Sequence, residues 1–178
     1  MRKNIAIFTV LIVAIATRFI PPYANTSAIG AVALLGGSWL GMRHAKFLGA
    51  IAILFISDII LNNTIHAASF EGFTLVYSGM GIVYAAHLFM VAYGAWSQTQ
   101  ANTIKYAGHA AVACIGFFLI SNIGAWMGNP VYPQNATGLM AAYAAGLPFL
   151  ATHFVATVGF GYVMQFALTR STALAKAS

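Results

Sequence analysis

Six apolar stretches divide the chain, and short segments richer in polar residues separate them. No stretch contains more than one charged residue, so each is a candidate transmembrane helix. The first three are shorter than the roughly 20 residues that cross the hydrocarbon, so their ends are either broken or shielded inside a bundle. The six predicted spans are Ile5–Thr17, Thr26–Leu40, Phe47–Leu61, Val76–Trp96, Ile104–Trp126 and Leu147–Leu168. The pattern predicts an all-α integral membrane protein, a six-transmembrane-helix bundle that forms a single domain over residues 1–178.

The basic residues are unequally distributed among the segments that link these spans. Lys and Arg near span ends are retained in the cytoplasm, so the segments that hold them are predicted to face inward. Alternate segments hold seven of the eight Lys and Arg residues, and Arg18 is the exception. Both termini are therefore predicted to lie inside. The seven residues assigned to the inner side are Arg2, Lys3, Arg43, Lys46, Lys105, Arg170 and Lys176.

The composition excludes a soluble domain. The chain is 61% hydrophobic and 6% charged, with a mean hydropathy of +0.84, whereas a soluble domain is about 25% charged. The formal net charge of +6 does not indicate nucleic-acid binding, because the basic residues are few, dispersed and explained by topology. The single cysteine, Cys114, excludes an internal disulfide and a multi-cysteine metal site. Residues 1–17 resemble a signal peptide, but no convincing cleavage site follows, so they are interpreted as the first span.

Polar, aromatic, Pro and Gly residues are concentrated in the segments that this topology places outside, namely residues 18–27, 62–77 and 122–135. Loops held by a rigid scaffold usually carry the binding residues of a protein. The sequence therefore predicts a small-molecule site that opens to the outer face. The candidate ligand-binding residues, from these segments and the neighbouring span ends, are Arg18, Asn25, Asp58, His66, Asn122, Trp126, Tyr132 and His153.

Asp58 is the only acidic residue inside a predicted span, and an ionisable group at membrane depth is a functional candidate by default. It lies near the outer end of its span, as does Arg18, so an ion pair between the two is one interpretation. A ligand contact and a role in proton coupling are the alternatives. Arg18 itself could clamp an anionic ligand group through its guanidinium, or it could anchor the first span at the head-group layer.

The sequence contains no complete catalytic constellation. It has no nucleophile elbow, phosphate loop or paired carboxylates, and its five histidines form no i, i+4 pair. We therefore expect no enzyme activity, no metal and no cofactor. His87 and His153 lie inside predicted spans, where each is either a satisfied core residue or part of a polar cavity. Ala110 and Cys114 are spaced four apart, which suits close helix packing within the protein or against a partner's helices.

Motifs along most of the chain resemble a family of small bacterial membrane proteins of unknown function. The residues that carry the resemblance are Arg18-x-x-Pro21, Asn25–Gly37, Ser57-Asp58, Phe117–Trp126, Tyr132-Pro133, Gly138-Leu139 and Leu147-Pro148-Phe149. In architecture this family is similar to the substrate-binding S-components of energy-coupling-factor vitamin transporters, with the cobalamin type nearest. That resemblance implies six short helices, both termini inside, a ligand pocket at the outer face, and a membrane coupling subunit with ATPases as partner.

The sequence and this resemblance together predict the substrate-binding subunit of a micronutrient uptake transporter, located in the bacterial cytoplasmic (inner) membrane. Its substrate would be vitamin-like, with cobalamin as one candidate. The sequence has no nucleotide-binding motif, so the energy would come from a partner ATPase. Two alternatives stay open. One is an accessory subunit of a larger membrane complex, and the other is a membrane enzyme that uses Asp58 and a histidine.

Overall fold

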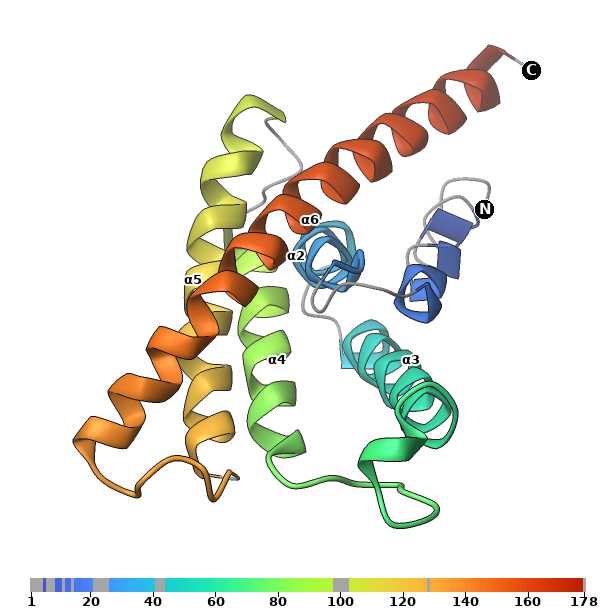
Figure 1. Ribbon diagram of the computed structural model, residues 1–178. Coiled ribbons are helices and arrows are strands. Elements are labelled where there is room, and N and C mark those ends of the chain that lie inside the picture. Colours follow the sequence, from blue (N-terminus) through green and yellow to red (C-terminus); the bar gives the residue numbers. More distant parts are fainter. Residues whose placement is uncertain are drawn as a thin grey trace.

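The computed structural model describes residues 5, 9–10, 12–13, 15–20, 26–40, 44–97, 103–127 and 129–177. These residues form helices joined by turns and loops, and none of them lies in a β-strand (Figure 1). The prediction of an all-α protein is therefore confirmed. In chain order the elements are the 3-10 helix η1 (Thr17–Phe19), α2 (Ile29–Leu40), α3 (His44–Asn63), the 3-10 helix η2 (Ala67–Ser69), α4 (Met80–Ser97), α5 (Thr103–Met127) and α6 (Ala136–Ala177).

Three helices of the described part are long and apolar enough to cross a membrane. They lie in α4, α5 and α6, over Met80–Ser97, Ile104–Met127 and Ala136–Ser171. The helices α2 and α3 contribute the shorter apolar segments Ile29–Trp39 and Leu54–Asn63. Of the first predicted span, residues 5, 9–10, 12–13 and 15–16 are described as α-helical.

The exposed surfaces of α5 and α6 carry large apolar side chains, as helices that contact lipid do. A soluble monomer rarely exposes so continuous an apolar surface. The exposed residues on these two helices are Ile104, Val112, Ile115, Leu119, Ile123, Met127, Met140, Leu147, Phe149, Val155, Tyr162, Val163 and Phe166.

The sixth helix departs most from its predicted range. We predicted the span Leu147–Leu168, whereas α6 covers Ala136–Ala177 and contains Pro148 in its interior. It begins directly after Asn135, whose side-chain oxygen accepts a hydrogen bond of 3.0 Å from the Gly138 N–H, as an N-cap residue does. Its 42 residues extend about 63 Å, roughly twice the hydrocarbon thickness. This length agrees with the oblique course of α6 across α4 and α5 in Figure 1.

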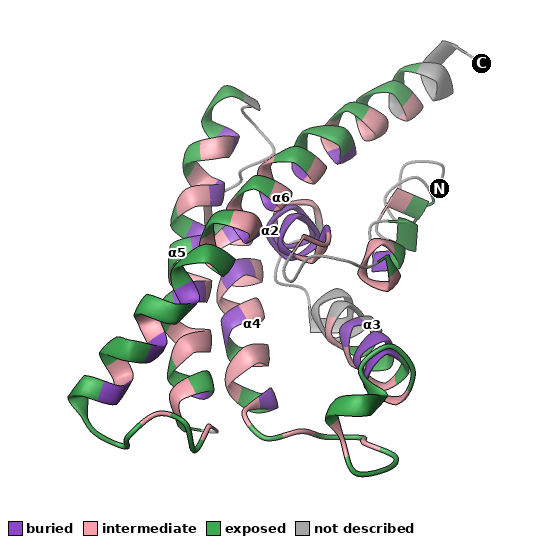
Figure 2. Cartoon of the chain, viewed as in Figure 1, coloured by how far each residue is buried: buried purple, intermediate pink, exposed green. Residues whose placement is uncertain are grey.

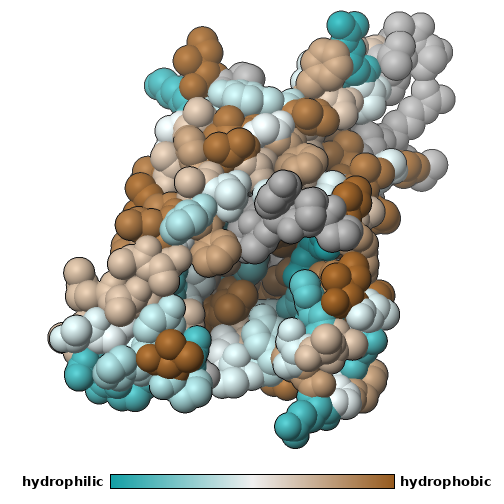
Figure 3. Space-filling model, viewed as in Figure 1, coloured by the Kyte–Doolittle hydropathy of each residue, from teal (hydrophilic) through white to brown (hydrophobic). Residues whose placement is uncertain are grey.

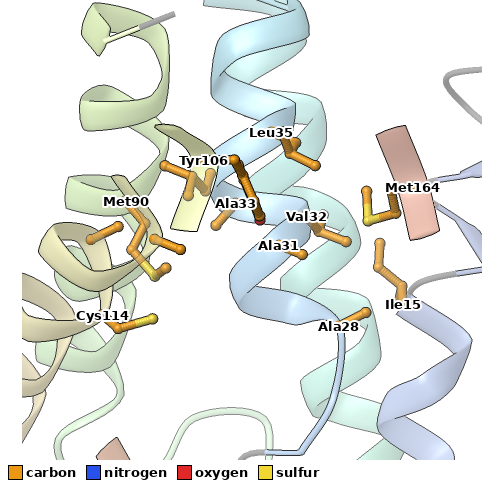
Figure 4. Close-up of a cluster of buried hydrophobic side chains, with 13 residues drawn as sticks. Ile15, Ala28, Ala31, Val32, Ala33, Leu35, Met90, Tyr106, Cys114 and Met164 are labelled. Carbon is orange, nitrogen blue, oxygen red and sulfur yellow. The ribbon is translucent and has the colours of Figure 1, made fainter. Parts of the chain in front are cut away.

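The short helix α2 lies at the centre of the bundle, where it packs against α4, α5 and α6 (Figures 1 and 2). Leu34 and Leu35 of α2 are fully buried. In Figure 4, Met90 and Tyr106 approach α2 from one side, and Met164 lies on the other. A helix of 12 residues is only about 18 Å long, too short to cross the hydrocarbon alone. The longer helices around α2 therefore provide the shielding that its length requires.

Small residues allow the helices of this core to approach closely. Ala110 and Cys114 of α5 are fully buried in the central cluster, so their predicted role in internal packing is confirmed. Helices α2 and α4 also approach each other closely. A Cβ added at Gly37 would overlap the Val91 carbonyl, and one added at Gly94 would overlap the Leu34 carbonyl. The two helix backbones are thus in direct contact at two glycines, as small residues permit in membrane bundles.

Helix α3 lies to one side of this bundle, next to η1 (Figure 1). It contacts α2 and η2, and its buried face presents Ser57, Asp58 and Asn62. Figure 3 shows that the surface is hollowed between α3 and the first half of α6. The buried polar groups of α3 and their partners on η1 and α4 define the candidate site.

Candidate functional site

Arg18 and Asp58 form an ion pair, as predicted. The Arg18 Nη2 lies 2.5 Å from Asp58 Oδ1, and this contact joins η1 to α3. The other carboxylate oxygen, Oδ2, accepts a hydrogen bond of 2.7 Å from the Tyr84 hydroxyl on α4. The Arg18 Nη1 donates to Ser57 Oγ and, at 3.5 Å, to the Leu54 carbonyl. We call Arg18, Ser57, Asp58 and Tyr84 the polar cluster.

The polar cluster compensates a buried charge. The side chains of Arg18 and Asp58 are only 17% and 7% exposed, and an unpaired carboxylate at that depth would be strongly disfavoured. Both carboxylate oxygens have hydrogen-bond donors, and the opposite charges of the pair cancel. The cluster therefore connects η1, α3 and α4, three elements of the fold that otherwise have little contact.

Tyr77 lies in the loop before α4, close enough to Asp58 for the carboxylate charge to act on it. Burial, reinforced by that charge, raises the pKa of the Tyr77 phenol to about 12. The phenol therefore stays protonated at physiological pH and adds a neutral hydrogen-bonding group beside the polar cluster.

Two histidines meet around one phenylalanine inside the bundle. The Phe117 ring on α5 contacts the His87 ring on α4 and the His153 ring on α6, with centroid distances of 4.8 and 4.7 Å in edge-to-face geometry. His87 Nδ1 lies 3.0 Å from the Val83 carbonyl. Nε2 of both histidines is buried without a hydrogen-bond partner among the described residues. Both histidines thus pack inside the bundle, and His87 is hydrogen-bonded to its own helix through Nδ1.

His153 lies deeper than the sequence indicated. We placed it among the outer loops and span ends, on a helix expected to begin at Leu147. Because α6 begins at Ala136, His153 falls well inside the helix and is only 3% exposed. A Cβ added at Gly30 of α2 would overlap His153 Nε2, so the imidazole packs against the backbone of the central helix.

Asn122 and Trp126 lie in the last turns of α5, and Tyr132 lies in the connection between α5 and α6. The Trp126 indole donates to the Pro133 carbonyl at 2.8 Å, and Asn122 Nδ2 donates to the Phe118 carbonyl at 2.8 Å. The Gln134 amide donates to the carbonyls of Trp126 and Tyr132, both at 3.0 Å. The bonds of Trp126 and Gln134 join the end of α5 to the loop before α6, so these two side chains tie the loop to the helix.

His66 lies in the exposed loop between α3 and α4. Asn63 fixes that loop, because its Nδ2 donates to the Thr74 carbonyl at 2.8 Å and its Oδ1 accepts from the Thr74 N–H at 2.7 Å. The loop lies at the same end of the helices as the α5–α6 connection (Figure 1). The segments predicted to share one side, 62–77 and 122–135, thus share one end of the bundle. Asn25 lies outside the described residues.

Ser57, Tyr84 and Phe117 were not among the eight predicted ligand-binding residues. Tyr84 and His87 are three residues apart and share one face of α4, but this spacing does not indicate that Tyr84 contacts Asp58. Phe117 offered no signal either, because an apolar ring inside a span is ordinary. Among the described residues, no three His, Cys, Asp or Glu side chains are grouped to hold a metal ion.

Two pockets on the surface of α6 are almost wholly apolar. One, of about 290 Å³, lies between α5 and α6 and is lined by apolar residues that include Cys114, Leu150 and Phe154. The other, of about 370 Å³, is lined by residues that include Thr26 and Val155. Neither offers charged groups to orient a polar ligand, so the polar cluster is the better candidate.

The fold and site define an all-helical protein with helices that suit a bilayer and a neutral polar cluster at one side of the bundle. The chain belongs to the family of unknown function DUF6580, whose match covers residues 1–176. No curated protein and no solved structure matches it. The match supports the predicted resemblance to a family of unknown function. Nothing in the comparisons supports a resemblance to S-components.

Proposed function

We propose that this chain is the substrate-binding subunit of a micronutrient uptake transporter in the bacterial cytoplasmic membrane, with a vitamin-like substrate. The polar cluster, in which both carboxylate oxygens of Asp58 are held by donors from η1 and α4, is the observation that carries the proposal. A small-molecule site combines apolar walls with a few fixed polar groups, and this region has both. Energy would come from a partner membrane subunit with ATPases.

The proposed topology has six spans with both termini in the cytoplasm. The distribution of basic residues supports it, because seven of eight fall in alternate segments. The shared end of the loops 62–77 and 122–135 agrees with this arrangement, since the proposal assigns both loops to the outer side. The ligand would then enter from outside, near the ends of α3 and α5.

Single-cysteine labelling tests this topology. In a Cys114→Ala background, Ser97→Cys should react with a membrane-impermeant maleimide only after the inner side is made accessible. Gln134→Cys should react in intact cells. The Cys114→Ala protein without an added cysteine is the control and should remain unlabelled. The reverse pattern would contradict both the topology and the side on which we place the ligand.

The ligand site is tested by native mass spectrometry of the full chain after gentle extraction. We expect a co-purified small molecule on the wild-type protein and at least about tenfold weaker binding to Trp126→Ala, equal to about 1.4 kcal/mol. Trp96→Ala is the matched control. Trp96 is an exposed tryptophan at the end of α4 that lies away from the loops 62–77 and 122–135, so this variant should retain the ligand. A binding role predicts little change in the melting temperature of Trp126→Ala, whereas a loop-tying role predicts a lower one with or without ligand.

Other outcomes favour the alternatives. A stoichiometric protein partner without any small molecule would support an accessory subunit of a larger complex. Conversion of a bound molecule by the purified protein would support a membrane enzyme. Either result would contradict the proposal that the chain is a transporter subunit.

A further inference from the structure

The connection between α3 and α4 ends in a short apolar stretch at one end of the bundle (Figure 1). Phe73, Leu75 and Val76 are 78%, 49% and 65% exposed. Isolated exposed apolar residues are common on proteins, but three within four positions form a patch that needs a partner. We call residues 73–76 the apolar segment. The earlier part of the same connection differs, because Ser69 and Glu71 expose polar side chains there.

The amide of Asn63, the last residue of α3, is bonded wholly to backbone groups. Its Nδ2 donates to the carbonyls of Thr74 and Ile59, both at 2.8 Å, and its Oδ1 accepts from the Thr74 N–H at 2.7 Å. The two bonds to Thr74 reproduce the exchange of hydrogen bonds between paired residues of neighbouring strands. Thr74, inside the apolar segment, therefore needs no water for its backbone N–H and C=O groups.

Asn63 lies on the face of α3 that suits contact with lipid. Ile56 and Ile60, on the preceding turns of this face, are 57% and 45% exposed. The hydroxyl of Thr64, which follows Asn63, donates to the Ile60 carbonyl at 2.6 Å. The polar groups at this end of the face are thus bonded within the protein. The exposed apolar face of α3 continues past Asn63 into the apolar segment.

Helix α4 is too short to cross the hydrocarbon, because its 18 residues extend about 27 Å against a thickness of about 30 Å. Trp96, exposed near its last residue, marks the head-group level at that end, since tryptophan is enriched at membrane interfaces. Met80 then lies about 3 Å short of the opposite boundary. The Met80 N–H donates to the Tyr77 carbonyl at 3.2 Å, so the chain just before α4 stays close to it. The apolar segment therefore lies near this boundary.

The bonds of Asn63 favour lipid over a protein strand as the partner of this segment. A strand from another protein would pair with free backbone N–H and C=O groups. At Thr74 both groups are already bonded to the Asn63 side chain. Insertion into lipid has the opposite requirement, namely that backbone polar groups are satisfied within the protein. Burial of a large apolar side chain contributes roughly 1.5–3 kcal/mol, so three such side chains favour insertion.

We propose that the apolar segment inserts into the bilayer leaflet at this end of the bundle, at the boundary between acyl chains and head groups, and that the Asn63 amide permits the insertion. Ser69 and Glu71 lie on the aqueous side of that boundary. The bilayer is then the partner of this loop, and it sets the depth of Tyr77, which follows the segment beside the polar cluster. This inference goes beyond micronutrient binding and depends neither on a ligand nor on which side the termini lie.

Spin-label collision rates test the insertion. The full-length protein with Cys114→Ala carries one nitroxide, at Phe73→Cys, Val76→Cys or Ser69→Cys, and is reconstituted into phosphatidylcholine vesicles. Oxygen concentrates in the bilayer, and a nickel chelate present on both sides stays in water. Oxygen collisions should exceed nickel collisions at Phe73→Cys and Val76→Cys, and the order should reverse at Ser69→Cys, the matched control in the same loop.

Two results would overturn the proposal. An excess of nickel collisions at all three sites would place the apolar segment in water. Low collision rates with both probes at Phe73→Cys and Val76→Cys would mean that protein covers the segment. Ligand occupancy of the wild type is measured separately, so failure of this proposal and failure of the proposed function are distinguishable.

Asn63→Ala tests the role of the amide. It leaves the Thr74 N–H and C=O without their side-chain partner, so the oxygen-to-nickel ratio at Phe73→Cys should fall toward the value at Ser69→Cys. Asn62→Ala is the matched control, because it removes a neighbouring amide that is buried on another face of α3, and it should leave the ratio unchanged. If Asn63→Ala does not fold, Asn63→Asp keeps the shape and removes the donor. An unchanged ratio in the Asn63 variant would refute the assigned role of this amide.

Discussion

Asp58→Ala is expected to lower the free energy of unfolding by about 3–5 kcal/mol, because it leaves a buried guanidinium without its counter-charge. The side chain of Arg18 is 17% exposed, and its bond to Asp58 connects η1 to α3. Tyr84→Phe removes one neutral donor from the carboxylate and should cost less, about 1–3 kcal/mol. The measurement is reversible unfolding in a mild detergent, and the loss of helical signal monitors the unfolding.

A double-mutant cycle separates the interaction energy of the ion pair from the contribution that each side chain makes by itself. Arg18→Met combined with Asp58→Leu removes both charges and replaces them with apolar groups of similar size. We expect the double variant to be more stable than either single variant, since no buried charge is left unpaired. If the double variant loses as much stability as the two single variants together, the two residues are not coupled.

The ion pair could be predicted from sequence because the chain offers few alternatives. It contains two acidic residues, and only Asp58 lies within a predicted span, near the same predicted end as Arg18. The participation of Tyr84 could not be predicted in the same way. Tyrosines occur throughout the apolar segments, and only the folded arrangement of the helices brings this hydroxyl of α4 to the carboxylate of α3.

The helical class followed from hydropathy, but the helix ends did not. Apolar residues indicate where a chain can be buried, whereas a helix begins where its first N–H groups find a cap. For α6 that cap is Asn135, and the helix starts there although its first residues are small and only moderately apolar. Because the predicted start of this helix was wrong, His153 was predicted to lie near the loops. In the structure it contacts Phe117, which also contacts His87.

The arrangement of helices around α2 depends on contacts that hydropathy does not encode. Glycines at 36 and 37 are visible in the sequence, but nothing there pairs Gly37 with the Val91 carbonyl or Gly94 with the Leu34 carbonyl. Small residues spaced four apart predicted close packing at the fifth span. The closest backbone contact lies instead between the second and the fourth.

Gly94→Ala tests that contact, because the expected sign is opposite to the ordinary effect of this substitution. Alanine in place of glycine inside a helix normally stabilises it by roughly 0.5–1 kcal/mol. At Gly94 the added Cβ would overlap the Leu34 carbonyl, a backbone atom that can move away only if α2 and α4 separate. We therefore expect a loss of about 1–3 kcal/mol, the usual cost of overpacking, and a similar loss for Gly37→Ala, whose Cβ would overlap the Val91 carbonyl.

Gly81 and Gly159 provide the matched controls, since a Cβ at either would meet no atom within 4 Å. Gly81 lies on α4 itself, and Gly159 lies on α6. Gly81→Ala and Gly159→Ala should leave the melting temperature in detergent unchanged or slightly raised, while Gly94→Ala and Gly37→Ala should lower it. Equal melting temperatures for Gly94→Ala and Gly81→Ala would mean that α2 and α4 are farther apart than described. The central position of α2, on which the burial of His153 beside Gly30 depends, would then have to be revised as well.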